Sequence, residues 1–320
     1  MSENLAPLPT PLVELIGFGE REVQVYMKLD HLTHPILSGN KYRKLKYNIT
    51  ALQENNLAGL LTFGGAYSNH IAATAAAGKI YNFKTIGIIR GEQPKVFGWT
   101  LQLAIQYGMK LIFMPRAEFD DPLIRKSFLI NSFADYLIVP EGGSNELGII
   151  GASEIPKEIL SQSEFHVNYI TCAMGTGGTA LGIAKSLQPK QRIIGFSALN
   201  PEKIEYLPQF VAEQGIVISE SAGKGYARTT QDQMDFINVF YDRYQIPLDP
   251  IYTSKMMMSL HSMIRSNYFK PGNRIVAIHT GGLQAWGGMM HKIPANEALR
   301  QVILSTLNTN KLSQYQQVTD

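Results

Sequence analysis

The stretch Ala173-Met174-Gly175-Thr176-Gly177-Gly178-Thr179 decides the fold, because it joins a strand to a helix through closely spaced glycines. The apolar run Tyr169–Ala173 predicts the strand, and the residues from Gly178 onward predict the helix. Glycine lets a backbone wrap closely around an anion, and the first N–H groups of a helix carry a partial positive charge. The stretch therefore predicts a phosphate-binding loop at the end of a strand.

This loop has other possible interpretations besides a phosphate site. Taken alone, it could also be a tight strand–helix turn that binds no ligand. A dinucleotide fingerprint fits the glycines at 175 and 177, but its sixth position is Ala180. No acidic residue ends a strand about 20 residues later, as that fingerprint requires. A Walker A loop is excluded, because no Gly-Lys-Ser/Thr follows.

Short apolar runs alternate with longer helical patterns on both sides of the loop. Further strands are predicted at Gly59–Phe63, Thr85–Arg90, Lys110–Met114, Tyr136–Val139, Arg192–Ser197 and Arg274–Ile278. Further helices are predicted at Tyr67–Tyr81, Val96–Tyr107, Leu123–Phe133, Glu146–Ser161, Thr230–Tyr244 and Ser254–Ser266. This alternation favours an α/β fold with open parallel sheets, in which ligands bind beyond the carboxyl ends of the strands. Glycine pairs follow two of these strands, at 64–65 and 281–282.

Composition restricts the classes of function. The 320 residues are 45% hydrophobic, which is enough for two lobes. A net charge of +3 does not favour nucleic acid or a membrane surface as a partner. No apolar stretch reaches the roughly 20 residues that cross a bilayer, and the N-terminus lacks a signal-peptide pattern. The single cysteine, Cys172, cannot form an internal disulfide, so we expect a cytoplasmic protein. The histidines show no metal-ligand spacing with each other or with this cysteine, so we expect no metal.

The segment Ser38-Gly39-Asn40-Lys41-Tyr42-Arg43-Lys44-Leu45 places Lys41 where a loop enters a helix. Solvated lysines at a basic helix start are the simple interpretation of such a cluster. Lys41 differs from its neighbours, because the helix dipole and the charges of Arg43 and Lys44 disfavour its protonated form there. A lowered lysine pKa is what an amine needs in order to form a Schiff base.

The segment Phe63-Gly64-Gly65-Ala66-Tyr67-Ser68-Asn69-His70 places three polar side chains at another helix start. Capping of the helix by Ser68 explains the serine without any ligand. The helix that follows is built from small residues, which indicates a site packed closely against a ligand. His70 fits a structural histidine as well as one that assists in the site.

Together these segments resemble the fold type II pyridoxal 5′-phosphate (PLP) enzymes. Within them, the match is to the family of 1-aminocyclopropane-1-carboxylate deaminase and D-cysteine desulfhydrase. The resemblance runs from Thr10-Pro11-Leu12 to Gly281-Gly282. It implies a two-lobed open-sheet α/β fold like that of tryptophan synthase β, and a homodimer. Residues 1–45 and 152–320 would form the large PLP-binding lobe, and residues 46–151 the small α/β lobe.

The resemblance also implies roles for single residues. Lys41 carries PLP as a Schiff base and, once displaced, acts as the base at the substrate Cα. Ser68 faces the substrate, and Asn69 bonds the phenolic oxygen of the cofactor. Tyr226 and Tyr252 line the substrate pocket. The phosphate is held by Gly175, Thr176, Gly177, Gly178 and Thr179, and the pyridine nitrogen is contacted by Thr253 or Thr280.

Two of these positions bear on the reaction. In the deaminases, as the resemblance implies, a glutamate occupies the position of Thr253 and a leucine that of Thr280. A carboxylate keeps the pyridine nitrogen protonated and the ring a strong electron sink, whereas a hydroxyl leaves the nitrogen largely neutral. Opening a cyclopropane needs the stronger sink, whereas β-elimination needs less. We therefore expect conversion of D-cysteine to pyruvate, sulfide and ammonia.

Some residues beside the expected substrate depart from the family and leave its identity open. They are Ser38, Lys46, Tyr67 and Ala73, where the family commonly has Gly, Glu, Gln and Arg. Deamination of 1-aminocyclopropane-1-carboxylate to 2-oxobutanoate and ammonia is one alternative. Dehydration of a D-serine-like substrate is another, and a PLP-binding protein without turnover is a third.

Overall fold

The computed structural model describes residues 8–20, 22–130, 133–198, 202, 204–218, 228–292 and 296–307. Two open sheets organise these residues. The larger sheet has the strand order β1-β2-β10-β7-β8-β9, and only β1 runs antiparallel to its neighbour. Its strands are β1 (Leu12–Glu14), β2 (Gln24–Lys28), β7 (Tyr169–Met174), β8 (Arg192–Ser197), β9 (Ile216–Ile218) and β10 (Arg274–Ile278).

The smaller sheet is parallel throughout, with the order β5-β4-β3-β6. Its strands are β3 (Gly59–Gly65), β4 (Lys84–Arg90), β5 (Lys110–Met114) and β6 (Tyr136–Val139). Nearly every residue of β3 and of β7 is buried. Helices cover both faces of a parallel sheet, which explains why these strands are continuous apolar runs without alternation.

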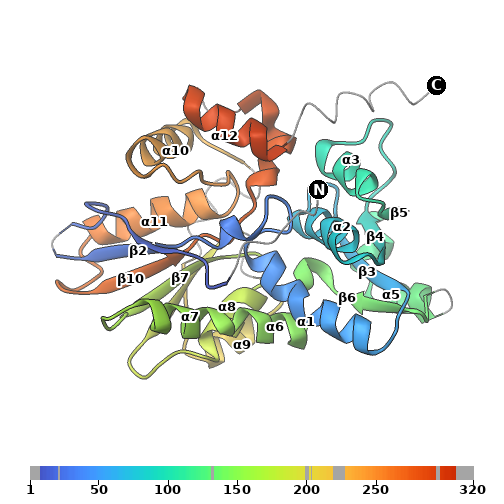
Figure 1. The fold of residues 1–320 in the computed structure, drawn as a ribbon, viewed down its shortest axis with the longest axis horizontal. Helices are drawn as coiled ribbons and strands as arrows, with labels where there is room; N and C mark the ends of the chain where they lie inside the picture. Colours follow the sequence, from blue (N-terminus) through green and yellow to red (C-terminus); the bar gives the residue numbers. More distant parts are fainter. Residues whose placement is uncertain are drawn as a thin grey trace.

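Helices flank both sheets (Figure 1). Those of the amino-terminal half are α1 (Asn40–Glu54), α2 (Asn69–Tyr81), α3 (Trp99–Gln106), α4 (Arg116–Asp120), α5 (Pro122–Ile130), α6 (Glu146–Ala152) and α7 (Glu154–Gln162). The others are α8 (Gly178–Ala184), α9 (Leu207–Ala212), α10 (Gln231–Tyr244), α11 (Thr253–Arg265) and α12 (Glu297–Leu307). Short 3-10 helices are η1 (Asp30–Thr33), η2 (Glu141–Gly143) and η5 (Leu283–Lys292). Within the described residues, no helix is both long and apolar enough for a membrane crossing.

The two lobes share an apolar core. Figure 1 shows α10 and α11 on one face of the large sheet and α6 to α9 on the other. The largest buried cluster includes Leu45 and Ile49 of α1, Ala76 of α2, and Met256 and Met257 of α11. Helix α1 therefore packs into the same core as elements of both lobes, and its first turn lies at their junction.

One predicted helix is wrong in its extent. The pattern from Glu146 to Ser161 predicts one helix, but the structure has α6 and α7, separated at Ser153. Pro156 is the cause, because a proline ring clashes with the carbonyl four residues earlier and donates no hydrogen bond. Proline is tolerated only in the first turn of a helix, so a new helix begins just before it.

Candidate active site

The carboxyl ends of strands from both sheets surround one cavity of ≈ 670 Å³. The large lobe contributes the loop after β7, the end of β10 and the residues before α11. The small lobe contributes the turn after β3 and the ends of β4 and β6. Residues from both lobes that line the cavity include Lys41, Lys44, Ser68, Asn69, Gly175, Thr176, Gly177, Thr179, Tyr252 and Thr280. This is the place that the open-sheet rule predicts for a ligand.

Backbone contacts fix the position of Lys41. Gly39, which precedes α1, has φ 59°, and a Cβ there would lie 2.1 Å from the carbonyl oxygen of Thr280. The N–H of Asn40 donates to that same oxygen at 3.1 Å. The side-chain Nδ2 of Asn40 donates to Thr179 Oγ1 at 3.0 Å. Lys41 is thereby held between the end of β10 and the loop after β7.

The amine of Lys41 is easier to deprotonate than that of an exposed lysine. Burial lowers its pKa to about 8, and the negative charge of Glu141 opposes this shift. The direction is the one predicted from the sequence, but the cause is different. Arg43 is engaged by Asp30 and therefore does not act on Lys41. An amine with this pKa is available as a nucleophile and as a base near neutral pH.

The loop after β7 is suited to an anion. Among the described residues, the backbone N–H groups of Thr176, Gly177 and Gly178 have no hydrogen-bond acceptor. The buried Lys44 lies beside them, and a Cβ on Gly178 would be 3.1 Å from its Nζ. Burial and the charge of Lys41 hold the pKa of Lys44 well below its usual value, so a bound anion would stabilise its charged form. This placement of Lys44 does not follow from the sequence pattern, in which Lys44 is only a neighbour of Lys41.

Ser68 and Asn69 begin α2 at the opposite wall. The Ser68 Oγ accepts hydrogen bonds from two N–H groups of the first helical turn, at 3.2 and 3.4 Å, so the predicted cap is present. Ser68 also lines the cavity, and the two roles coexist. Asn69 Nδ2 comes so close to the end of β10 that a Cβ on Gly282 would lie 2.8 Å away. His70 is buried with its Nε2 2.8 Å from Thr62 Oγ1, which favours the structural interpretation.

The remaining predicted residues are divided between the cavity and the core. Tyr252 and Thr280 line the cavity. Thr253 is 0% exposed, does not line the cavity, and its hydroxyl has no hydrogen-bond partner among the described residues. The Asp249 carboxylate fixes this turn by accepting from the N–H groups of Tyr252 and Thr253, each at 2.7 Å. Tyr226 lies outside the described residues.

Three charged residues on the small-lobe wall were missed from the sequence. Arg90 ends β4, and its Nε donates to Asp120 Oδ1 at 2.8 Å. Glu141 follows β6, and all three side chains line the cavity. The sequence does contain a signal for two of them, since Arg90 and Glu141 stand at the ends of two predicted strands, and ligands bind beyond the carboxyl ends of parallel strands. That signal is less specific than the motifs of the glycine-rich turns.

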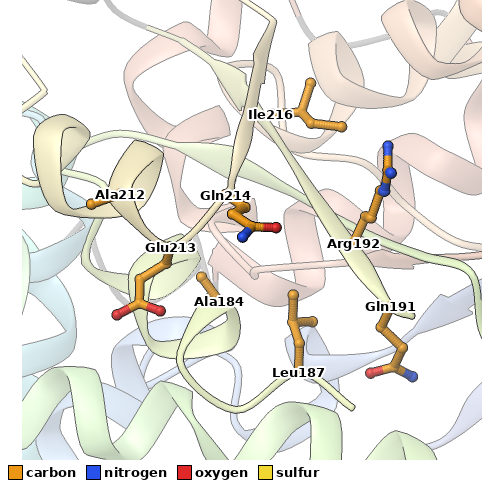
Figure 2. A pocket seen from close by; sticks show the side chains of 8 residues that line it. All are labelled: Ala184, Leu187, Gln191, Arg192, Ala212, Glu213, Gln214 and Ile216. Carbon is orange, nitrogen blue, oxygen red and sulfur yellow. The ribbon is translucent and has the colours of Figure 1, made fainter. Parts of the chain in front are cut away.

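A second hollow, of ≈ 460 Å³, lies away from these strand ends (Figure 2). It is lined by Arg192, the first residue of β8, by Ile216, the first residue of β9, and by the end of α9. This is the amino-terminal edge of the large sheet. Ligands of open parallel sheets bind at the other edge, so we place the active site in the larger cavity.

Comparison with known proteins identifies the family. The sequence profile of pyridoxal-phosphate-dependent enzymes matches residues 4–281. The chain belongs to this family of PLP-dependent enzymes. A protein of Thermotoga maritima, provisionally named as a 1-aminocyclopropane-1-carboxylate deaminase, is 28% identical over 88% of this chain and 96% of its own length. The bifunctional D-cysteine desulfhydrase/1-aminocyclopropane-1-carboxylate deaminase of Arabidopsis thaliana mitochondria is 28% identical over 88% of this chain and 78% of its own.

The fold agrees with that of solved family members. A crystal structure titled as a homologue of 1-aminocyclopropane-1-carboxylate deaminase superposes with a TM-score of 0.76 and 25% identity. The match covers 94% of this chain and 95% of that one. The PLP-dependent enzyme described here has the fold type II architecture expected from its motifs, and its cofactor is PLP.

The cavity fits this cofactor. Lys41 offers an amine of lowered pKa for the cofactor aldehyde, and the three N–H groups after β7, with Lys44, offer donors for its phosphate. When bound, PLP withdraws electrons from the substrate Cα and so stabilises negative charge there. Asn69 and Thr280 line the space between these two anchors.

Replacing Gly175 with alanine is expected to lower PLP affinity at least tenfold with little loss of stability. A Cβ at Gly175 would meet no protein atom nearer than 3.6 Å, where it touches the Tyr252 ring, but it would enter the space beside the phosphate donors. Gly177→Val is a poorer probe, because Gly177 has φ +89° and a side chain there strains the folded chain as well. Titration of the apoprotein with PLP, alongside thermal unfolding, measures both quantities. Unchanged affinity in folded Gly175→Ala would place the phosphate elsewhere.

Proposed function

We propose that the chain catalyses PLP-dependent β-elimination and deamination of a small amino acid, with D-cysteine as the substrate. D-cysteine and water would give pyruvate, sulfide and ammonia. The observation that carries the proposal is the cavity wall at the end of β10, where the hydroxyl-bearing Thr280 stands beside the Lys41 site. Within the described residues, no carboxylate lines the cavity at this wall, because that of Asp249 is buried and accepts from the N–H groups of Tyr252 and Thr253. This wall therefore favours a largely neutral pyridine nitrogen, which suits elimination better than ring opening.

Each residue of the cavity would have its own role in the proposed reaction. Lys41 would hold the cofactor, and its amine, with a pKa of about 8, is suited to take a proton from the substrate Cα. Ser68, Asn69 and Tyr252 would receive the substrate carboxylate or the reacting carbon. The first turn of α2 would support an anion there, because helix N-termini carry partial positive charge. Thr280 would contact the ring nitrogen, and the loop at 175–179 would hold the phosphate.

Deamination of 1-aminocyclopropane-1-carboxylate is the second candidate. The names of the Thermotoga and Arabidopsis relatives both include this activity, and the Arabidopsis name includes the D-cysteine activity as well. A PLP-binding protein without turnover would show the cofactor's colour but release no keto acid from any amino acid. The presence of both Lys41 and Ser68 in the cavity lining supports an active enzyme over that interpretation.

The two substrates distinguish the two candidates directly. We expect kcat/KM for pyruvate release from D-cysteine to exceed that for 2-oxobutanoate release from 1-aminocyclopropane-1-carboxylate by at least tenfold. Side-by-side steady-state assays on the purified holoenzyme measure the ratio. Preference for the cyclopropane would make the argument from Thr280 wrong, and the deaminase assignment would replace it.

A further inference from the structure

The wall of the cavity formed by the small lobe carries a carboxylate without a partner. Glu141 begins η2, separated by one residue from the end of β6, and lines the cavity, with no hydrogen bond or ion pair among the described residues. Arg90, its neighbour across β3, is already held by both oxygens of Asp120. The one group on this wall that is ready to bind an incoming charge is therefore Glu141.

Charged groups of both signs act on Glu141 without pairing with it. They are the guanidiniums of Arg125 and Arg90 and, more weakly, the carboxylates of Asp120 and Glu205. The amine of Lys41 interacts with Glu141 as well, again without an ion pair between them. Burial raises the pKa of Glu141, as expected for a carboxylate that no cation contacts closely.

The sheet places this carboxylate beside the expected substrate. In the order β4-β3-β6, the turn after β3 carries Ser68 and Asn69, and Glu141 follows the adjacent strand. An amino acid whose carboxylate lies on the first turn of α2 would have its side chain near this wall. A positively charged side chain would meet the carboxylate of Glu141 there, whereas an acidic side chain would be repelled by it.

We propose that Glu141 selects amino acids whose short side chain ends in an ammonium group, of the 2,3-diaminopropionate class. The inference rests on the proposed function, because the same elimination would act on this substrate. The Cα–H bond breaks and its proton goes to Lys41. The Cβ–N bond then breaks, and its electron pair leaves with the nitrogen as ammonia. With one water, the products are pyruvate and two molecules of ammonia, and no oxidant is needed.

The test compares 2,3-diaminopropionate with 2-aminobutyrate, in which a methyl group replaces the ammonium. Binding of both enantiomers to the holoenzyme is followed by the change in the cofactor's visible absorbance, which requires no turnover. Glu141→Gln is expected to weaken 2,3-diaminopropionate at least tenfold and 2-aminobutyrate less than twofold. Glu141→Asp keeps the charge and should retain most of the preference. Glu92→Gln is the matched control, because Glu92 is exposed and does not line the cavity.

The outcomes separate this inference from the proposed function. Absorbance changes without keto-acid release from any substrate would overturn the proposed function, while the Glu141→Gln comparison would still decide the selectivity. An equal loss for both ligands in Glu141→Gln would overturn the inference. So would tighter binding of aspartate than of 2,3-diaminopropionate, which would make Arg90 the residue that selects the side chain.

Discussion

Replacing Lys41 with alanine is expected to reduce kcat at least about a thousandfold, since both cofactor attachment and proton transfer at Cα depend on this amine. Borohydride reduction followed by peptide mapping should place the cofactor on Lys41 in the wild type and find no adduct in the variant. PLP should still bind non-covalently, because the phosphate donors after β7 are unchanged. Keto-acid release and the mapped adduct are the two measurements.

Two lysines of the same helix serve as controls for this experiment. Lys46 does not line the cavity, although the resemblance to the family places it beside the substrate. It pairs with Glu154 at 2.7 Å, so Lys46→Ala should keep activity within about twofold. Lys44 lines the cavity, and its loss should weaken PLP binding while leaving the adduct on Lys41. An adduct that maps to Lys44 or Lys46 in the wild type would make the assignment of Lys41 wrong.

Arg43→Ala is expected to cost about 3–5 kcal/mol of unfolding free energy, because it would leave the buried Asp30 carboxylate without its cation. The fully buried Arg43 bonds Asp30 at 2.6 and 2.8 Å and Glu158 at 2.8 Å through two nitrogens. Lys28 also contacts Glu158, at 2.9 Å, but its other hydrogen bonds go to Thr10 O and Gln162 Oε1, so Asp30 has no second cation among the described residues. Urea unfolding of the PLP-saturated proteins, followed by tryptophan fluorescence, measures the loss.

The matched control for this loss is Lys46→Ala, on the same helix. Its ion pair with Glu154 is partly exposed, and such pairs contribute at most about 1 kcal/mol. We expect PLP affinity in folded Arg43→Ala to fall as well, since the network anchors the turn of α1 that carries Lys41. A loss no larger than that of Lys46→Ala would show that the buried network does not stabilise the fold.

Much of the fold follows from local sequence pattern. The parallel strands are uninterrupted apolar runs between glycine turns, so β3, β7 and β10 could be located closely. The short β1, β2 and β9 were missed, because three to five residues carry too little periodicity, and β1 and β9 also lie at the edges of the sheet. The lobe boundaries at 45/46 and 151/152, the homodimer and the cytoplasmic location stay predictions.

In the candidate site, too, the residues that belong to local sequence motifs could be predicted, and those that depend on long-range contacts could not. Residues in glycine-rich motifs could be predicted, since Lys41, Ser68 and the loop at 175–179 stand next to the turns that expose them. Glu141 and Lys44 could not, because their roles depend on which strands and loops become neighbours across the chain. The choice between Thr253 and Thr280 was open for the same reason. Both residues are buried, and what separates them is that Thr280 lines the cavity and Thr253 does not.

The origin of the two walls on separate sheets has a consequence for redesign. Lys41 is positioned through the main-chain oxygen of Thr280, just after β10, so no side-chain exchange on the small lobe alters that position. Arg90 ends β4, and Asp120 and Glu141 lie on α4 and η2 of the small lobe. None of the three takes part in the hydrogen bonds that fix Lys41. Libraries confined to those three positions should therefore change which amino acids are accepted while every member keeps its colour.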